Sequence, residues 1–108
     1  MSLPPLDDDE RRRALDKAAA ARKARAALKE ELRQGTIGID EVLRRADQDE
    51  AIARAKVSDV LETLPNVGKV RAQRLMDELG ISPSRRLRGL GANQRARLSE
   101  AFARDRRR

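Results

Sequence analysis

The stretch LPNVGKVRAQRLMDELGI, residues 64–81, is the most informative part of the sequence, because it interrupts one helical pattern and starts another within a few residues. Its proline fixes one backbone angle, while Asn66 and Gly68 accept the left-handed conformation that most residues resist. Apolar residues then follow with helical spacing over residues 68–79, and Gly80 fits the left-handed cap that often ends a helix. The stretch therefore predicts two helices joined by a tight hairpin.

The rest of the chain also has helical rather than strand-like patterns. A long helix is expected from about Asp8 to Arg33, because this segment has no Gly or Pro, starts with acidic residues that suit the positive end of a helix dipole, and stops before Gly35. Ser82 and Pro83 have the residue types of a helix cap and first position. The further helices are expected from Asp40, near Asp49, over 57–64, from 82 to Gly89–Gly91, and over 92–104.

These patterns predict an all-α fold, with a long N-terminal helix beside a compact helical domain. The N-terminal helix segment comprises residues 1–35, the domain residues 36–103, and a basic tail residues 104–108. Only the last turns of the long helix, with Leu28 and Leu32, have the apolar side chains needed to dock firmly. Side chains expected to face the core elsewhere are Val60, Leu61, Leu64, Val67, Val70, Leu75, Met76, Leu79, Leu98 and Phe102.

The composition excludes several classes of function. The 108 residues suffice for one small domain, and they include no cysteine and no histidine, which excludes disulfides, thiol nucleophiles, the usual zinc sites and histidine acid–base catalysis. No apolar run approaches the roughly 20 residues of a membrane span, and the first residues lack a signal-peptide pattern. We therefore expect a soluble cytoplasmic protein without a metal, a cofactor, a membrane contact or a small-molecule substrate.

The net charge is concentrated at one end of the sequence. The chain has 25 basic and 18 acidic residues, a net charge of +7, and residues 84–108 hold nine arginines against Glu100 and Asp105, so this segment accounts for the whole net charge. Such a basic segment favours a polyanionic partner. The one aromatic residue, Phe102, argues against single strands, whose bases proteins usually stack on several rings. Among nucleic acids, a duplex is therefore the expected partner.

The hairpin in residues 64–81 has the features of an anion site. The first N–H groups of a helix have no partner within it, and here they belong to Val67–Val70, beside the cations Lys69 and Arg71. Such a site can hold a nucleic-acid phosphate without reading a base. It is not a nucleotide P-loop, because the required earlier glycine and the hydroxyl residue after the lysine are both missing. The alternative is an ordinary corner between helices with solvated cations.

A second basic cluster lies in SRRLRGLGANQ, residues 84–94. Arg85, Arg86 and Arg88 precede a close turn that two glycines permit, and arginine can bind phosphate with two donors or enter a narrow minor groove. These arginines therefore predict a second phosphate or groove contact. The alternative is a capped short helix with solvated arginines.

A cationic stripe on the N-terminal helix is the third candidate surface. Helical spacing puts its members on one face, which either contacts nucleic acid or is solvated. The members are Arg22, Arg25, Lys29 and Arg33.

Together these segments resemble a known family of DNA-binding proteins. Residues 64–81 resemble the helix–two-turn–helix and helix–hairpin–helix signature. With SLPPL near the start, the long basic helix and SRRLRGLGANQ, residues 2–102 resemble the actinobacterial integration host factor. The resemblance implies a small, all-helical, nucleoid-associated protein that binds duplex DNA with little sequence preference, bends and compacts it, influences its topology and assists site-specific integration.

The resemblance carries the family's binding positions onto the hairpin and onto the arginine cluster. Asn66 departs from the pattern, since this type of hairpin often has glycine there. The candidate DNA-binding residues are Asn66, Val67, Gly68, Lys69, Val70, Arg71, Arg74, Arg85, Arg86, Arg88, Gly89, Asn93 and Gln94, with Arg22, Arg25 and Lys29 as additional contacts.

Two cationic surfaces on one small monomer could hold two DNA segments or two points of one bent duplex. Two other functions stay open. Small-subunit ribosomal protein S13 resembles the same motif, including the LGI after the hairpin helix, so the partner could be structured RNA. Similar hairpins also occur in DNA glycosylases, where Lys69 would be the amine nucleophile. Because the chain lacks a second catalytic domain and histidine, we expect no enzyme activity.

Overall fold

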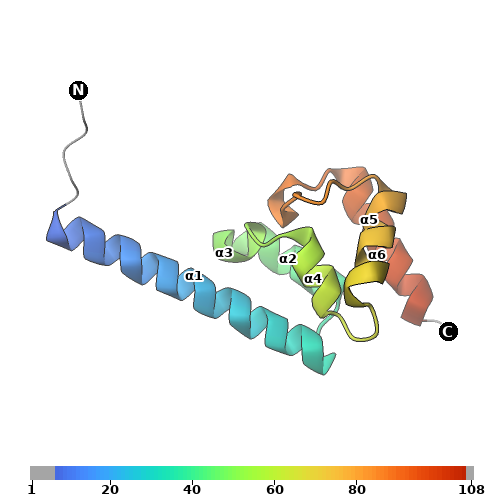
Figure 1. Cartoon of the computed structure of the whole chain (residues 1–108), viewed down its shortest axis with the longest axis horizontal. Helices are drawn as coiled ribbons and strands as arrows, with labels where there is room; N and C mark the ends of the chain where they lie inside the picture. Colours follow the sequence, from blue (N-terminus) through green and yellow to red (C-terminus); the bar gives the residue numbers. More distant parts are fainter. Residues whose placement is uncertain (1–6, 107–108) are drawn as a thin grey trace.

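The computed structural model describes residues 7–106, which form helices and, within that range, no β-strand (Figure 1). The predicted all-α fold is confirmed. The SLPPL segment and the last two arginines lie outside the described residues. The elements are α1 (Asp8–Gln34), α2 (Ile39–Gln48), α3 (Glu50–Ala53), α4 (Val57–Thr63), α5 (Gly68–Leu79), the 3₁₀ turn η1 (Leu87–Gly89) and α6 (Ala92–Arg106).

Helix α1 is long and docks only through its last turns, as predicted. Asp7 caps its start by accepting a hydrogen bond from the Glu10 N–H at 2.6 Å, and Gly35 ends it with a φ of 74°. Its buried residues are Leu28 and Leu32. The earlier turns project from the body of the molecule (Figure 1). Because of this projection the molecule is elongated, with overall dimensions of 56 × 31 × 24 Å.

The core is formed by the last turns of α1 together with residues of α2, α3, α4, α5, η1 and α6. Phe102 is half-buried against it, in agreement with the prediction. Val70, also expected in the core, is instead 73% exposed. The reason is helical geometry: Ala72 and Met76 define the buried face of α5, and a residue two positions before Ala72 points about 200° away from that face. The largest fully buried side chains are Leu28, Leu32, Ile39, Leu61, Leu87, Leu98, Val42, Val57 and Val60.

The prediction that a helix starts at Ser82 and Pro83 is wrong, because this segment forms backbone hydrogen bonds with a distant part of the chain. The Leu87 N–H donates to the Ala55 carbonyl at 2.9 Å, and the Val57 N–H donates to the Arg85 carbonyl at 3.0 Å. Only the single turn of η1 is helical. These long-range hydrogen bonds, with the burial of Leu87, outweigh a local capping signal of about 1 kcal/mol.

Helix α6 begins at Ala92, as predicted, and continues to Arg106, two residues beyond the predicted end. The first part of the predicted basic tail is therefore helical. Arg95 ties α6 to α2 through a two-donor ion pair with Asp47, with both N–O distances 2.8 Å, and the Ser99 hydroxyl donates to Asp40 on α2. These contacts hold the C-terminal helix on the body of the domain.

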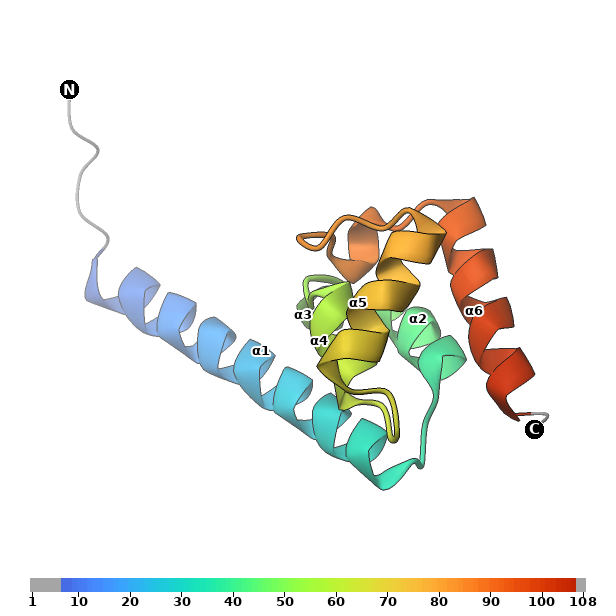
Figure 2. The same ribbon diagram turned by 45° about the vertical axis from the view of Figure 1, so that its right-hand side comes forward.

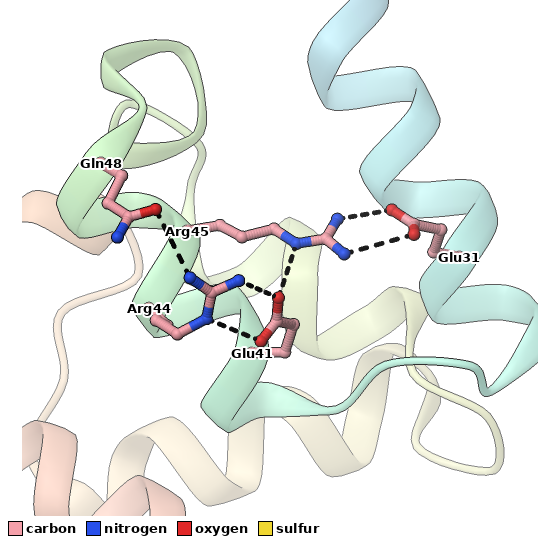
Figure 3. A network of polar contacts seen from close by, with 5 residues as sticks. All are labelled: Glu31, Glu41, Arg44, Arg45 and Gln48. Atoms are coloured by element: carbon pink, nitrogen blue, oxygen red, sulfur yellow. Dashed lines mark hydrogen bonds and ion pairs between the residues drawn. The ribbon is translucent and has the colours of Figure 1, made fainter.

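A network of charged side chains fastens α1 to α2 (Figure 3). The Arg45 guanidinium donates to both carboxylate oxygens of Glu31 on α1, at 2.6 and 3.3 Å, and to Glu41 one turn before it on α2, at 3.0 Å. Arg44 donates to the same Glu41 at 2.5 and 2.9 Å. The hydrogen bonds from Arg44 and then Arg45 lower the pKa of Glu41 to about 2, and the bond from Arg45 lowers the pKa of Glu31.

Candidate nucleic-acid interface

The hairpin between α4 and α5 has the backbone conformation that its sequence predicts. Asn66 has a φ of 66° and Gly68 a φ of 70°, so both residues are left-handed. Asn66 is the one non-glycine residue with positive φ among residues 7–106. Asparagine tolerates this region better than most residues, which explains how it replaces the glycine common in such hairpins.

The hairpin presents the start of α5 to solvent. No side chain caps this N-terminus by a hydrogen bond, and Gly68, Lys69 and Val70 are all exposed. The first N–H groups of a helix and the positive end of its dipole attract anions. Arg74 is exposed one turn further along α5, and the Arg71 guanidinium donates to the Asn66 carbonyl at 3.4 Å. The arrangement can hold a phosphate group by backbone donors and nearby cations.

Val67 has a different role from its neighbours. It is half-buried and packs against the core, and its N–H donates to the Leu64 carbonyl at 3.3 Å. Its N–H is therefore already paired, and it contributes by fixing the hairpin. Beside it lies a surface depression of about 690 Å³, between the hairpin and the link from α1 to α2.

The predicted arginine cluster lies on the segment before and within η1, and its three side chains differ in their contacts. Arg85 folds back over the turn and donates to the Gly89 carbonyl at 3.0 Å. Arg86 donates to the Arg54 carbonyl at 2.6 Å, which anchors it on the link after α3. Arg88 is exposed on η1. Arg86 and Arg88 line a common groove, whereas Arg85 does not.

Gln94 is engaged within the fold. Its side-chain oxygen accepts a hydrogen bond from the Gly91 N–H at 3.0 Å, and its side-chain nitrogen donates to the Gly80 carbonyl at 3.0 Å. It thus caps the start of α6 and ties α6 to the end of α5. Asn93, its predicted companion, is exposed beside the arginine cluster.

The hairpin and the arginine cluster lie at opposite ends of α5 (Figure 2). The hairpin immediately precedes the first residue of α5, and the arginine cluster follows the last residue of α5 in the sequence. Figures 1 and 2 both place the hairpin at the lower end of α5 and the arginine segment near its upper end. The 12 residues of α5 span roughly 18 Å, so the two surfaces are far enough apart to touch separate parts of a duplex.

The cationic stripe predicted on α1 is only partly brought to these surfaces. Arg25 and Lys29 line the groove that Arg86 and Arg88 share, while Arg22 lies outside it. Arg33 forms an ion pair with Glu30 at 3.2 Å. Sequence reasoning missed two further groove cations, Arg54 and Lys56, because they lie in a short link that contains no run of basic residues.

Two features are absent from residues 7–106. No helix in that range is long and apolar enough to cross a membrane. No group of carboxylates in the same range is arranged to hold a metal ion.

The chain is similar to known proteins over most of its length. Residues 32–102 match the family described as S13-like H2TH domain. The Integration host factor of Mycobacterium tuberculosis is 55% identical over 102 residues, which cover 94% of this chain and 97% of that protein. The Integration host factor of Streptomyces coelicolor is 50% identical over 102 residues, with 94% and 95% covered. A solved structure of sIHF bound to an 8-bp palindromic DNA superposes with a TM-score of 0.77 and 49% sequence identity, covering 81% of this chain and 98% of that chain.

Proposed function

The chain belongs to the family of actinobacterial integration host factors, and from this premise we propose that it binds duplex DNA of the nucleoid with little sequence preference and bends or compacts it. Relatives that it matches over nearly their full length are named integration host factors, and the chain, like them, is not an enzyme. Through bending, it would influence DNA topology and assist site-specific integration. It would act as a monomer with double-stranded DNA as its partner.

The observation that carries the proposal is the hairpin. The left-handed residues Asn66 and Gly68 expose the uncapped start of α5, with Lys69 beside it. Backbone N–H groups bind phosphate oxygens and carry no sequence information, because every nucleotide has the same phosphate. A protein that holds DNA in this way should therefore treat different sequences alike.

The distance between the two surfaces supports bending. In the proposed complex, a duplex held at the hairpin curves toward Arg86 and Arg88 at the other end of α5 and contacts both surfaces. Contacts made only in the curved state would stabilise it, and they would offset a bending cost of roughly 1–6 kcal/mol. The same geometry would also allow a second duplex to bind, which would compact DNA by bridging.

Structured RNA is the second candidate partner, because residues 32–102 match a domain family described as S13-like. The physics of phosphate binding is the same in both cases, so the polymer must be distinguished by experiment. Overall similarity to integration host factors over 94% of the chain favours DNA.

Fluorescence anisotropy tests the proposed function. A random-sequence DNA duplex, an RNA duplex of the same sequence and single-stranded DNA are each titrated with the protein at two salt concentrations. We expect the tightest binding for the DNA duplex, a salt slope of about −0.9 for each phosphate contacted, and similar affinities for several DNA sequences. Preference for RNA would favour the ribosome-like function, and strong preference for one DNA sequence would contradict backbone recognition.

Lys69→Gln and the double variant Arg86→Gln/Arg88→Gln locate the contacts in the same assay. Each should weaken binding to every duplex by about the same factor, since removal of a phosphate contact acts uniformly across sequences. Arg44→Gln is the control, because Arg44 is a cation of the same domain that is already paired with Glu41.

A further inference from the structure

A groove on one side of the molecule collects cations from distant parts of the sequence. It has a volume of about 580 Å³ and lies between α1, the link from α3 to α4, and the arginine segment. One acidic residue, Asp59 on α4, also lines it. The cations that line it are Arg25, Lys29, Arg54, Lys56, Arg86 and Arg88.

The cations of the groove differ in their pairing from those on α2 and near the start of α6. Arg44, Arg45 and Arg95 are all paired with carboxylates. In the groove, Arg54 is paired with Glu50 at 2.7 Å, but within the part of the chain that the structure describes no carboxylate pairs with the other five cations. Gathering unpaired like charges in one concave surface is unfavourable unless an external anion neutralises them. The groove therefore fits a polyanion.

Backbone hydrogen bonds hold together two of the segments that line the groove. The Leu87 N–H donates to the Ala55 carbonyl, the Val57 N–H donates to the Arg85 carbonyl, and the Leu87 side chain is buried. Arg86 is held by its hydrogen bond to the Arg54 carbonyl. A side chain held in this way loses less conformational entropy on binding, so more of its electrostatic attraction remains as affinity.

We propose that this groove is a binding track for the phosphate backbone of duplex DNA, in which Arg25 and Lys29 of α1 and Lys56 extend the contact that Arg86 and Arg88 begin. The proposal rests on the proposed function and assigns to α1 a direct role in DNA binding. Asp59 is the one repulsive group in the track, and it limits the affinity there.

The triple variant Arg25→Gln/Lys29→Gln/Lys56→Gln tests the proposal by anisotropy with a random-sequence DNA duplex. Loss of three phosphate contacts should make the slope of log affinity against log salt less steep by roughly three, and should lower affinity at about 0.1 M salt by tenfold or more. The converse variant, Asp59→Asn, should raise affinity by up to several-fold, since it removes an exposed negative charge from the track.

The matched control is Arg12→Gln/Arg13→Gln/Lys23→Gln, which removes three exposed cations of α1 that do not line the groove. If the groove binds the phosphate backbone, the groove variant should lose much more affinity for duplex DNA, and much more of the salt dependence of that affinity, than this control variant of the same net charge. Equal losses in both variants, or no loss in the groove variant, would overturn the proposal. Failure of the unmodified protein to bind duplex DNA would contradict the proposed function itself, which separates the two outcomes. Circular dichroism melting checks that all variants are folded.

Discussion

Position 68 requires a backbone conformation that glycine adopts without strain and other residues do not. Gly68 has a φ of 70°, and a Cβ atom built there would meet no other atom within 4 Å. An added methyl group would therefore act through backbone strain and through its presence at the start of α5. Substitutions in the hairpin can therefore distinguish effects on the stability of the fold from effects on DNA binding.

We predict that Gly68→Ala and Gly80→Ala each lower the free energy of unfolding by about 1–2 kcal/mol, because each forces alanine into the left-handed region. Gly80 is a matched control, since its φ is 68° and the space around it is also open. Only Gly68→Ala should also weaken binding to duplex DNA, because Gly68 is the first residue of α5, where the phosphate is proposed to bind. Urea unfolding and anisotropy measure the two effects, and equal affinity losses in both variants would argue against a contact at Gly68.

Val70 allows a second prediction at the residue scale, with opposite signs for stability and binding. It is the third residue of α5 and is 73% exposed. Val70→Asp places a negative charge at the positive end of the helix dipole, so it should leave stability unchanged or raise it by about 0.3–1 kcal/mol. The same charge should weaken DNA binding by about tenfold or more, because it repels the phosphate.

The uncharged variant Val70→Asn separates charge from loss of the valine side chain. It should retain most of the affinity that Val70→Asp loses. If Val70→Asp binds duplex DNA as well as the unmodified protein does, no phosphate sits at the start of α5.

At the scale of elements, the firm attachment of α1 depends on few groups. Two buried leucines dock its last turns, and Arg45 ties Glu31 of α1 to Glu41 of α2. If the groove beside α1 binds DNA, this attachment also sets where Arg25 and Lys29 stand. The network therefore links the stability of the fold to the geometry of the binding track.

The network predicts loss of stability in acid. The pKa values of Glu41, Glu31 and Asp47 are lowered by hydrogen bonds from arginines, to about 2 for Glu41 from an ordinary value of 4.5. Between these pH values the unfolded chain binds more protons than the folded one, so stability falls as pH is lowered from about 4.5 to about 2. Thermal unfolding followed between pH 7 and pH 2 should show this decline.

Arg45→Met should reduce that pH dependence, because it removes the donor that Glu31 and Glu41 share. The control is Arg54→Met, since Arg54 pairs with Glu50 outside the network. A decline of the same size in Arg45→Met and in the unmodified protein would show that the network does not cause it.

Elements defined by local signals could be predicted from the sequence, and elements defined by distant contacts could not. The long α1, the hairpin with Asn66 and Gly68, and the glycine cap of α5 all follow from residues close in sequence. The prediction of a helix from Ser82 was wrong, because this segment forms its hydrogen bonds with the chain just after α3, more than 25 residues earlier. The prediction that Val70 lies in the core was wrong, because the position of an apolar residue near the start of a helix does not by itself show which face of that helix is buried.

The same division explains what was missed in the candidate interface. Basic runs and hairpin residues were visible in the sequence, but the groove is made by three segments that only the fold brings together. Lys56 is a single lysine between alanine and valine, and nothing local marks it as a binding residue. Only its pairing with Arg86 across the isolated bridge places it among the other cations.

At the scale of the whole molecule, the proposed bending requires two surfaces at opposite ends of α5 to act on one duplex. Neither surface alone explains bending, because a single point of contact leaves a stiff duplex straight. Removing either surface should therefore reduce bending even at protein concentrations that saturate binding. A protein that only bridged separate duplexes would not behave in this way.

The most direct test is resonance energy transfer between dyes at the two ends of a duplex of about 30 bp, which is short enough to stay nearly straight by itself. The unmodified protein should raise the transfer efficiency at saturation, and Lys69→Gln and Arg86→Gln/Arg88→Gln should each raise it less while still binding. Unchanged transfer on saturation by the unmodified protein would contradict bending. Full bending by either variant would contradict the claim that both surfaces hold the same duplex.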